Sequence, residues 1–594
     1  MAIIGIDLGT TNSLGAVYRE NRVELIPNRH GSYLTPSVVS VDDDNNILVG
    51  EIAKERLIAE PGSSASSFKK DMGTDKKYKL GKKTFTPEEL SSFVIRAIVE
   101  DAKEYLQEEI EEAIISVPAY FNDKQRVATK KAGILAGVKM DRIINEPSAA
   151  AMASYFDTSE EQVFLIFDFG GGTLDISIVE CFDTVVEILS VAGDNRLGGD
   201  DFHDIMVRGF LCENAISPKT VTNKEYAVLK KQAEICKRKL TTEKSGKMSA
   251  VIGGREYKSE YTNQRLLEES SEIFSKIKKV LAHALRDGEM TLADIDTVVM
   301  VGGSSKMPLV QSFVQHVLRQ KPIVVGNCDE MIARGLGLVC AVKERQEEIK
   351  DYILTDICPF TLGTDIFNEA DPQHSYMSPI VPRNSVLPCS KVKRFYTIKD
   401  DQQKIDLNIL QGEQVYAEDN LSLGKLTIPI PKAKKGEESV DVRFTYDING
   451  ILLVDVTVVS TGKTVSKVVS QNVSEEDLYK KIQELEKLKV HPKNVSENQL
   501  LLERLRALYE EAPTYLRENI LEFIREFEKI LEGQDTRRIK KYRKFLEKVI
   551  KQYSFVDPFA GEFKFEEFEE DEEQGEEEEF DFYSALDGGS EWTS

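Results

Sequence analysis

The chain contains one short phrase twice, and this repeat constrains its fold more than any other feature. The copies read IIGIDLGTTNSLGAV and LIFDFGGGTLDISI. Superposing them aligns two aspartates and two glycines, each pair 161 residues apart: Asp7 with Asp168, and Gly9 with Gly170. Each copy is an apolar strand, an aspartate, a glycine-containing turn and a second apolar strand. This order predicts two β-hairpins.

The turns of both predicted hairpins are almost free of large side chains. Glycine leaves backbone N–H groups open to close approach by an anion. A single hairpin of this kind is most often only a tight turn. Two of them, each led by a strand-end aspartate, are better explained as facing halves of one site. The pattern fits a polyphosphate held between two domains, with carboxylates that hold Mg²⁺ through its water molecules.

The length of 594 residues predicts three or four domains. We find no apolar run near the ~20 residues of a membrane span, and no basic region precedes the first apolar stretch, so no signal peptide is predicted. The seven cysteines form no CxxC pair, which argues against zinc and against a disulfide framework. These features predict a cytoplasmic protein with reduced thiols.

The net charge of −24 is concentrated at one end. Residues 557–594 hold 16 acidic residues and one lysine, and the other 556 residues carry only −9. Nucleic-acid binding therefore has no electrostatic support. We expect charge repulsion to keep this tail disordered, and its interleaved phenylalanines leave binding to a partner open.

Residues 1 to about 350 alternate strand and helix patterns, which is typical of an α/β domain. Examples are the predicted strands Glu112–Tyr120 and Thr297–Ser305 and the predicted helix Asp123–Gly137. The following DYILTD carries apolar residues where a linker is usually polar. Two interpretations stay open for it: a segment that docks part of the time, or an ordinary strand of the next domain.

The later part of the chain changes from strands to helices. Alternation at Val440, Val442, Phe444 and Tyr446, followed by an Asn-Gly turn, predicts a sandwich of seven to nine strands. From Ser474 the apolar period is helical. Further amphipathic helices are predicted at 497–511, 514–532 and 535–553, with their apolar stripes forming the core of a small bundle.

Five stretches carry a family resemblance when they are read together: the two hairpins, VPAYFND, NEPSAAA and VGGSSKMP. They resemble the DnaK-type seventy-kilodalton heat-shock chaperones, members of the actin-like ATPase superfamily, over about residues 1–555. FKKDMG, PEELSS and ILTDICPFTLG further resemble the HscC-like bacterial branch.

The resemblance implies a multidomain fold. The implied parts are an α/β actin-like ATPase domain (1–350), an apolar linker (351–356), an all-β sandwich that binds peptides (357–473), a short α-helical lid bundle (474–556) and an acidic disordered tail (557–594). The implied function is that of an ATP-dependent chaperone, which binds apolar segments of unfolded polypeptides with an affinity controlled by ATP binding and hydrolysis. The alternative is a nucleotide-responsive peptide holdase with little hydrolysis.

The resemblance also assigns site residues. Phosphate binding is assigned to the two turns, at Thr10, Thr11, Asn12, Gly170, Gly171 and Gly172. Binding of hydrated Mg²⁺, flanked by K⁺, is assigned to Asp7 and Asp168. Hydrolysis of ATP to ADP is assigned to Lys69, which helps to position the attacking water, and to Glu146, Thr173 and Asp175. Binding of the nucleoside is assigned to Glu234, Lys237, Arg238, Gly302, Gly303, Ser304 and Asp329. Lys306 and Cys328 depart from the family's usual arginine and proline there.

For the sandwich, the resemblance implies an apolar peptide groove at Phe367, Ile398, Ile405 and Leu407. An interpretation as core strand residues stays open, above all for Leu407. Phe367 and Ile398 are bulkier than is usual in the family, which implies altered selectivity.

The linker is implied to dock on the ATPase domain in the ATP state. A J-domain co-chaperone is implied to contact Arg142, Asn145 and Asp356. The segment between Gly73 and Leu80 is short for the family, which implies faster release and leaves the need for a nucleotide exchange factor open. Neither a nucleic acid nor a membrane is expected as a partner.

Three other ATP-binding classes are disfavoured. A sugar or acetate kinase, or an actin-like filament protein, has no use for about 240 further residues of sandwich and helices. A P-loop is excluded because TGKT at Thr461 lacks the upstream glycine, position 457 being Thr457.

Overall fold

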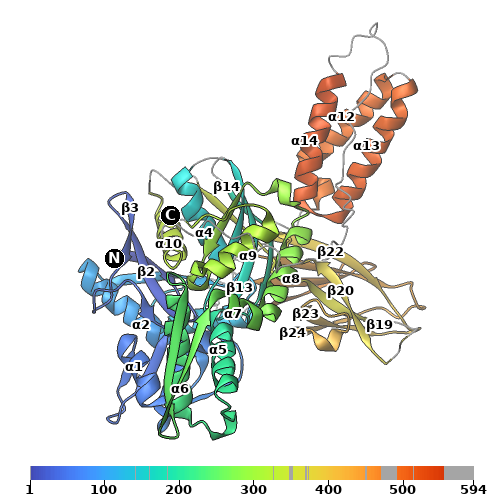
Figure 1. Cartoon of the computed structure of the whole chain (residues 1–594). Helices are drawn as coiled ribbons and strands as arrows, with labels where there is room; N and C mark the ends of the chain where they lie inside the picture. The colour runs from blue at the N-terminus through green and yellow to red at the C-terminus, as the bar shows by residue number, and fades with distance from the viewer. Residues whose placement is uncertain are drawn as a thin grey trace. The chain divides into compact units, whose positions relative to one another are not determined.

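The computed structural model describes residues 2–553, apart from 141, 159–160, 183–184, 325–326, 347–351, 368–370, 372, 448–450, 470–490 and 513. Two units are separated by their contacts. The first consists of residues 1–494 and 534–536, and the second of residues 495–533 and the chain from 537 onward. Each unit is described by itself (Figure 1).

The first predicted hairpin is present and lies inside a larger sheet. β1 (Ala2–Asp7) pairs antiparallel with β2 (Asn12–Arg19) and parallel with β10 (Ile110–Val117). The strand order is β11 (Ile143–Asn145), β10, β1, β2 and β3 (Arg22–Ile26). β10 is the predicted strand Glu112–Tyr120, and it stops before Pro118 because proline has no N–H for the ladder.

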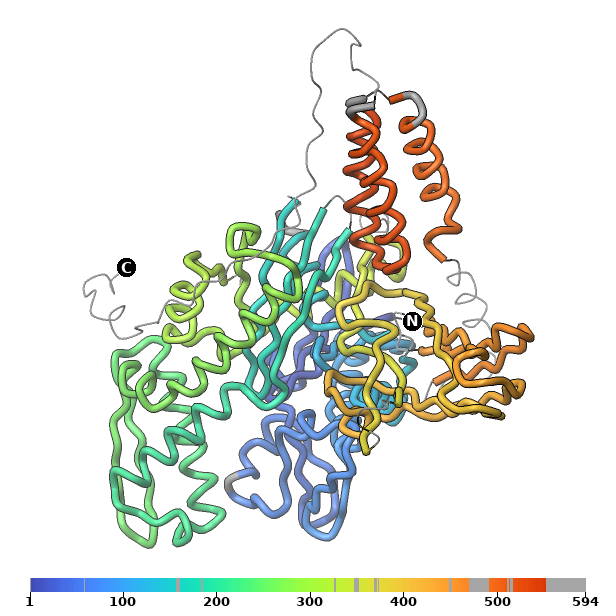
Figure 2. The backbone as a smooth tube through the Cα atoms, turned by 90° about the vertical axis from the view of Figure 1, so that its right-hand side faces the viewer, coloured from blue at the N-terminus to red at the C-terminus, as the bar shows by residue number. Residues whose placement is uncertain are grey.

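The second hairpin repeats this arrangement. β12 (Gln162–Phe169) pairs antiparallel with β13 (Leu174–Phe182) and parallel with β17 (Thr297–Val301). Each aspartate-bearing strand thus has a hairpin partner on one side and a parallel neighbour on the other, which confirms the internal repeat. The sheet continues through β14 (Val185–Asp194), which lies beside β13 in both views (Figures 1 and 2).

The parallel strands of the first sheet bring separate segments to one edge. β1, β10 and β11 run in the same direction, so their carboxyl ends meet there. Asp7 ends β1, and Glu146 follows β11 as the first residue of α4 (Glu146–Thr158). α4 packs closely on α10 (Met331–Lys343). A Cβ added to Gly335 of α10 would lie only 1.8 Å from the Ala149 carbonyl oxygen of α4. The sheet edge therefore rests on tightly packed helices.

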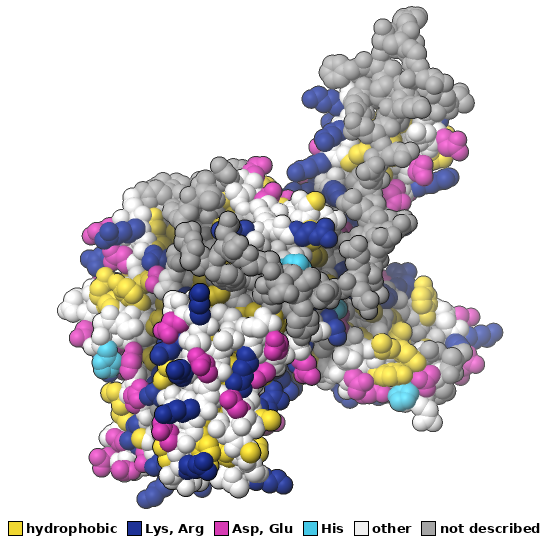
Figure 3. Space-filling model, viewed as in Figure 1, with side chains coloured by type: hydrophobic (Ala, Val, Ile, Leu, Met, Phe, Trp, Pro, Cys, Tyr) yellow, Lys and Arg dark blue, Asp and Glu magenta, His cyan; other side chains and the backbone are white. Residues whose placement is uncertain are grey.

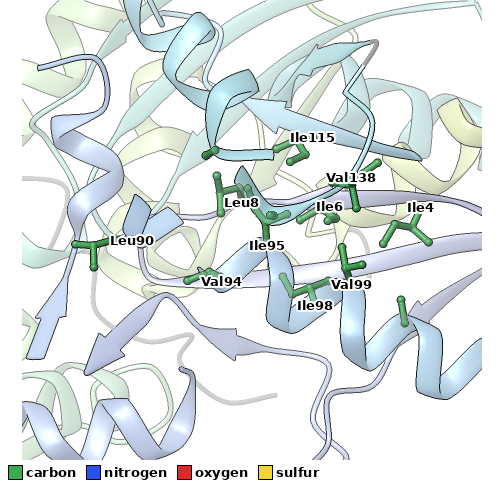
Figure 4. Close-up of a cluster of buried hydrophobic side chains, with 14 of the residues drawn as sticks. Ile4, Ile6, Leu8, Leu90, Val94, Ile95, Ile98, Val99, Ile115 and Val138 are labelled. Atoms are coloured by element: carbon green, nitrogen blue, oxygen red, sulfur yellow. The ribbon is translucent and has the colours of Figure 1, made fainter. Parts of the chain in front are cut away.

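The other face of this sheet is covered by α2 (Pro87–Leu106) and α3 (Asp123–Ala136). Leu90, Val94 and Ile98 of α2 recur every fourth residue and share a buried cluster with Ile4 of β1 (Figure 4). α3 is the predicted helix Asp123–Gly137. It ends where Gly137 adopts a left-handed φ of 90°.

The predicted sandwich is also present. One sheet has the order β20 (Ser375–Val381), β19 (Leu362–Phe367), β23 (Lys404–Gln411) and β24 (Leu421–Pro429). The other has the order β22 (Cys389–Tyr396), β25 (Ser439–Tyr446), β26 (Leu452–Val458) and β27 (Thr464–Val469). Val440, Val442, Phe444 and Tyr446 all point into the core, as their alternation predicts. The predicted Asn-Gly turn lies outside the described residues.

The apolar segment before the sandwich forms β18 (Ile353–Ile357). It pairs parallel with β14, with Val185 opposite Ile353 and Glu187 opposite Thr355. It pairs antiparallel on its other side with the short β21 (Val386–Leu387). The segment is thus an ordinary strand, but it completes the second sheet rather than one of the sandwich sheets.

The second unit is helical. α12 (Ser496–Glu511), α13 (Thr514–Gly533) and α14 (Thr536–Tyr553) match the three later predicted helices. Their apolar stripes form one core that includes Leu505, Ile520 and Leu546. The helix predicted from Ser474 and the acidic tail lie outside the described residues. Within the described helices, no segment combines the length and the apolar character that crossing a bilayer requires.

Candidate functional site

The turns of the two hairpins touch each other. A Cβ added to Gly171 would lie 1.9 Å from Thr11 Oγ1, and one added to Gly172 would lie 2.8 Å from Thr10 Cγ2. Side chains larger than hydrogen therefore do not fit between the turns. The two turns face each other, as the repeat in the sequence predicts.

A cavity of about 1180 Å³ opens at these turns. Most of the predicted site residues line it: Asp7, Thr10, Thr11, Asn12, Lys69, Glu146, Asp168, Gly170, Gly171, Thr173, Glu234, Lys237, Arg238, Gly302, Gly303, Ser304 and Asp329. Of the residues predicted for nucleotide binding and hydrolysis, only Gly172 and Asp175 are not among its lining residues. Segments from Asp7 to Asp329 thus meet around one space.

A buried ion pair lies in the wall of the cavity. Lys69 Nζ is 2.7 Å from Glu146 Oε1, and both side chains are 6% exposed. Lys69 comes from the short helix η2 (Phe68–Asp71), and Glu146 begins α4 at the edge of the first sheet. The pair places one fixed cation among several carboxylates.

Three carboxylates beside this pair are buried. Burial, followed by the charge of Glu146, raises the pKa of Asp7 and of Asp175 to about 7. The same causes raise the pKa of Asp168 well above its usual value. Ser116 Oγ donates to Asp7 Oδ1 at 2.8 Å, whereas Asp175 Oδ2 has no hydrogen-bond partner among the described residues. Buried carboxylates with too few partners form a place where a cation is stabilised.

Another part of the cavity wall is formed by α6 (Asn223–Lys239). Glu234 pairs with Lys54 at 3.1 Å and with Arg238 at 2.7 Å. Lys237 Nζ donates to the Gly199 carbonyl oxygen at 3.1 Å, and burial lowers the pKa of Lys237 to about 8. This part of the wall therefore offers charged groups that a polar ligand can bind.

Lys306, the predicted departure from the family pattern, is held from two sides. Its Nζ lies 2.5 Å from Asp329 Oδ2 and 2.6 Å from Asn327 Oδ1. Cys328 is buried between these partners in the chain. The ammonium group is thus fixed at the cavity wall.

Several residues of the cavity were not predicted from the sequence. Asp200 and His203 line the cavity, and His203 Nδ1 lies 3.6 Å from one oxygen of Asp200. The other oxygen of Asp200 pairs at 3.2 Å with Lys70, which is not among the lining residues. Asp200 and His203 belong to α5 (Gly199–Glu213). Only the fold brings Lys70 near α5, so neither motif nor spacing could have indicated this contact.

The predicted peptide-groove residues are not equally accessible. Phe367 is 43% exposed and Ile398 is 40% exposed, whereas Ile405 is partly buried. Leu407 is 5% exposed and packs in the sandwich core. Its placement is that of a core strand residue, the interpretation that the sequence left open.

The three residues predicted to contact a J-domain lie together at the end of β18. Asn145 Nδ2 donates to Asp356 Oδ1 at 2.5 Å, and Arg126 donates to Asn145 Oδ1 at 2.7 Å. Burial raises the pKa of Asp356. Burial lowers the pKa of Arg142, and the attraction of Arg142 to Asp356 partly offsets this lowering. The cluster ties the β18 strand to the end of β11.

Comparison with known proteins assigns the chain to a family. Residues 3–557 match the family model described as Hsp70 protein. The chain is 35% identical to the chaperone protein DnaK of Thermotoga neapolitana, over 91% of this chain and 94% of that protein. It is 36% identical to the chaperone protein DnaK of Thermosipho melanesiensis, over 83% of this chain and 85% of that protein. The chain therefore belongs to the Hsp70 family of ATP-hydrolysing molecular chaperones.

Proposed function

We propose that the cavity at the two hairpin turns binds ATP, and that hydrolysis there controls how tightly the β-sandwich holds an apolar peptide. The observation that carries this proposal is the contact between the turns beside the buried Lys69–Glu146 pair. Phosphate groups that bind in the cavity, where both turns line its wall, can accept from backbone N–H groups of two different sheets. One ligand can thus bridge two halves of the domain.

The donor set suits a hydrated Mg²⁺ ion. Asp7 and Asp168 are buried carboxylates whose pKa values are raised by burial, and an adjacent divalent cation would offset that rise by stabilising their charged forms. Among the described residues, no group of three or more His, Cys, Asp or Glu side chains could form a closed metal cage. Mg²⁺ commonly uses only one or two carboxylates together with waters and phosphate oxygens. When bound, it would neutralise phosphate charge. K⁺ ions beside it remain a prediction from the resemblance.

The residues of the chain supply positioning and charge. Phosphoryl transfer needs neutralisation of charge and an aligned nucleophile more than covalent help. Lys69 provides a fixed positive charge, and Glu146 orients its ammonium group. Asp175, which we expect to complete the polar ring around the attacking water, has one buried oxygen without a partner among the described residues. Thr173 in the second turn lies at the cavity wall, where its hydroxyl can hold a phosphate oxygen.

The nucleoside would bind at the α6 part of the cavity wall. Glu234 and Lys237 can bind ribose hydroxyl groups, and Arg238 can cover the base. Gly302, Gly303 and Ser304 provide the facing wall. Lys306 differs from an arginine in having no planar group to stack under adenine. We expect weaker stacking on the base in this chain, and more of the affinity from the phosphate side.

Coupling to the sandwich would run through β18. This strand pairs with β14, which itself pairs with β13 of the second phosphate hairpin. The sandwich also contacts the α/β part directly. Gln411 Oε1 accepts from the Asp123 backbone N–H at 3.0 Å, and Arg383 pairs with Asp287. A nucleotide that binds more tightly when these contacts are present stabilises the state that contains them. By linkage, the nucleotide and the peptide then change each other's affinity by the same coupling free energy.

The partners follow from the same sites. Exposed Phe367 and Ile398 would contact apolar side chains of an extended peptide. A J-domain co-chaperone would bind near Arg142, Asn145 and Asp356, where contact with the linker can influence hydrolysis. The short segment from Gly73 to Leu80 favours nucleotide release that needs no exchange factor. A holdase with little hydrolysis is not favoured, because the proteins of this family are ATPases.

The test is fluorescence anisotropy of a labelled apolar peptide in saturating ATP and in saturating ADP. We expect faster exchange and weaker binding with ATP. Turnover of ATP is measured in parallel, with and without an unfolded peptide. Equal peptide affinity in both nucleotides, in a chain that hydrolyses ATP, would contradict the coupling but not the nucleotide site.

A further inference from the structure

The outer surface of α14 carries a row of basic side chains. Arg537, Lys541, Lys544, Lys548 and Lys551 follow one another at intervals of four, three, four and three residues. On an α-helix this spacing places all five on one side. All but the partly exposed Arg537 are exposed. We call this row the basic stripe.

The opposite side of α14 packs in the core of the helical bundle. Ile539, Tyr542, Leu546 and Val549 are all buried there. The basic stripe therefore lies on the face that the bundle does not use. In Figure 3, Lys and Arg side chains follow the side of the helical unit where Figure 1 places α14.

The charge on this helix is nearly all of one sign. α14 contains eight lysines and arginines and a single acidic residue, Glu547. Within the described part of the chain, Lys544, Lys548 and Lys551 have no ion-pair partner. Like charges four residues apart repel one another on a helix surface. At these three positions of the stripe, no anion among the described residues relieves this repulsion.

We propose that the acidic tail, residues 557–594, folds back and docks on the basic stripe of α14. The tail carries 16 acidic residues and one lysine, and it begins four residues after α14 ends. Pro558 and Gly561 lie between the helix and the first acidic run, where they suit a chain reversal. The two segments are therefore adjacent and opposite in charge.

The tail is long enough to cover the stripe. A helix of 18 residues spans about 27 Å at about 1.5 Å per residue. An extended chain at about 3.3 Å per residue covers this length in about eight residues. The run Glu562–Glu573 alone has twelve residues. Single exposed ion pairs contribute little, but several charges acting together give a measurable attraction.

The lone tryptophan of the chain, Trp592, lies in the tail and makes a direct test simple. The full-length variant Phe568→Trp/Trp592→Phe moves this single reporter into the first acidic run. We expect its anisotropy to be high at 0.1 M salt. Between about 0.1 and 1 M salt the Debye length shortens from about 10 to about 3 Å, so quenching by acrylamide should rise about two-fold. Neither result should depend on protein concentration.

A charge variant of the stripe provides the second arm. In the same background, Lys541→Gln/Lys544→Gln/Lys548→Gln should release the reporter at 0.1 M salt, and glutamine preserves the helix. The matched control, Lys432→Gln/Lys434→Gln/Lys435→Gln, removes three exposed charges from the sandwich and should change nothing. Three results would overturn the proposal. The reporter tryptophan is mobile at 0.1 M salt, or the control variant releases it, or its anisotropy is high only at high protein concentration.

Discussion

Lys69 and Glu146 form an ion pair of 2.7 Å in which both side chains are almost fully buried. They are separated by 77 residues in the chain and come from different elements. The pair is both a structural contact and the proposed centre of hydrolysis, and these two roles can be separated experimentally.

Lys69→Gln leaves Glu146 buried without its cation, so we expect a loss of stability of about 3–5 kcal/mol. Single-turnover hydrolysis should fall by roughly 10²-fold or more, the scale of losing one preorganised charge. Lys69→Gln/Glu146→Gln should recover most of the melting temperature while hydrolysis stays low. Recovery of hydrolysis together with stability would show that the pair is only structural.

Gly171→Ala should separate the two hairpin turns, because the new Cβ would lie 1.9 Å from Thr11 Oγ1. We expect a lower melting temperature and weaker ATP binding, measured by calorimetry. Gly170 has nothing closer than 3.8 Å to such a Cβ, so Gly170→Ala is the matched control for stability. Equal melting temperatures of the two variants would contradict the close contact of the turns.

Lys237 should make the nucleotide-free protein more stable at alkaline pH. Burial lowers its pKa to about 8, below its unfolded value of about 10.5. Between these values the unfolded chain binds more protons, so stability rises with pH. From pH 7.5 to 9.5 we expect a gain of roughly 1–2 kcal/mol, seen in urea unfolding. Lys237→Met should remove this gain and weaken ATP binding. A pH dependence unchanged in Lys237→Met would contradict the assignment.

Two neighbours in β18 should differ in their effect on coupling. Leu354 packs against the core of the α/β part, whereas Ile353 is 55% exposed. Leu354→Asp should abolish the difference in peptide affinity between ATP and ADP, because a carboxylate would be placed against an apolar core. Ile353→Asp should retain it. If the two variants behave alike in peptide anisotropy, docking of this strand is not what links the sites.

The sandwich offers a similar comparison. Leu407→Ala creates a cavity in the sandwich core and should lower the free energy of unfolding by about 2–5 kcal/mol. Phe367→Ala removes an exposed ring, so it should weaken peptide binding several-fold with little change in melting temperature. A Phe367→Ala variant with unchanged peptide affinity would remove this residue from the groove.

The sequence predicted most of the fold because its signals are local. A glycine turn after a strand-end aspartate, apolar alternation as at Val440 and Val442, and helical stripes each depend on a few neighbouring residues. The repeat added one long-range inference, the facing of the two turns, and the contact between Gly171 and Thr11 agrees with it.

What could not be predicted depends on tertiary contacts. The pairing of Lys70 with Asp200 arises only when the fold brings η2 and α5 together. The burial of Leu407 could not be separated from exposure in a groove, because both suit an apolar residue in an alternating strand. The role of β18 was open for the same reason, since strand character does not say which sheet a strand joins.

The short ladder between β14 and β18 has a further consequence. If β18 leaves in one nucleotide state, β14 is left with unpaired N–H and C=O groups along Val185–Glu187, which is an open sheet edge. Open edges recruit other extended chains, including a second copy of the same protein. Among the described residues the pairing covers three residue pairs, so the release of β18 would newly expose only a short stretch of this edge to an intruding strand.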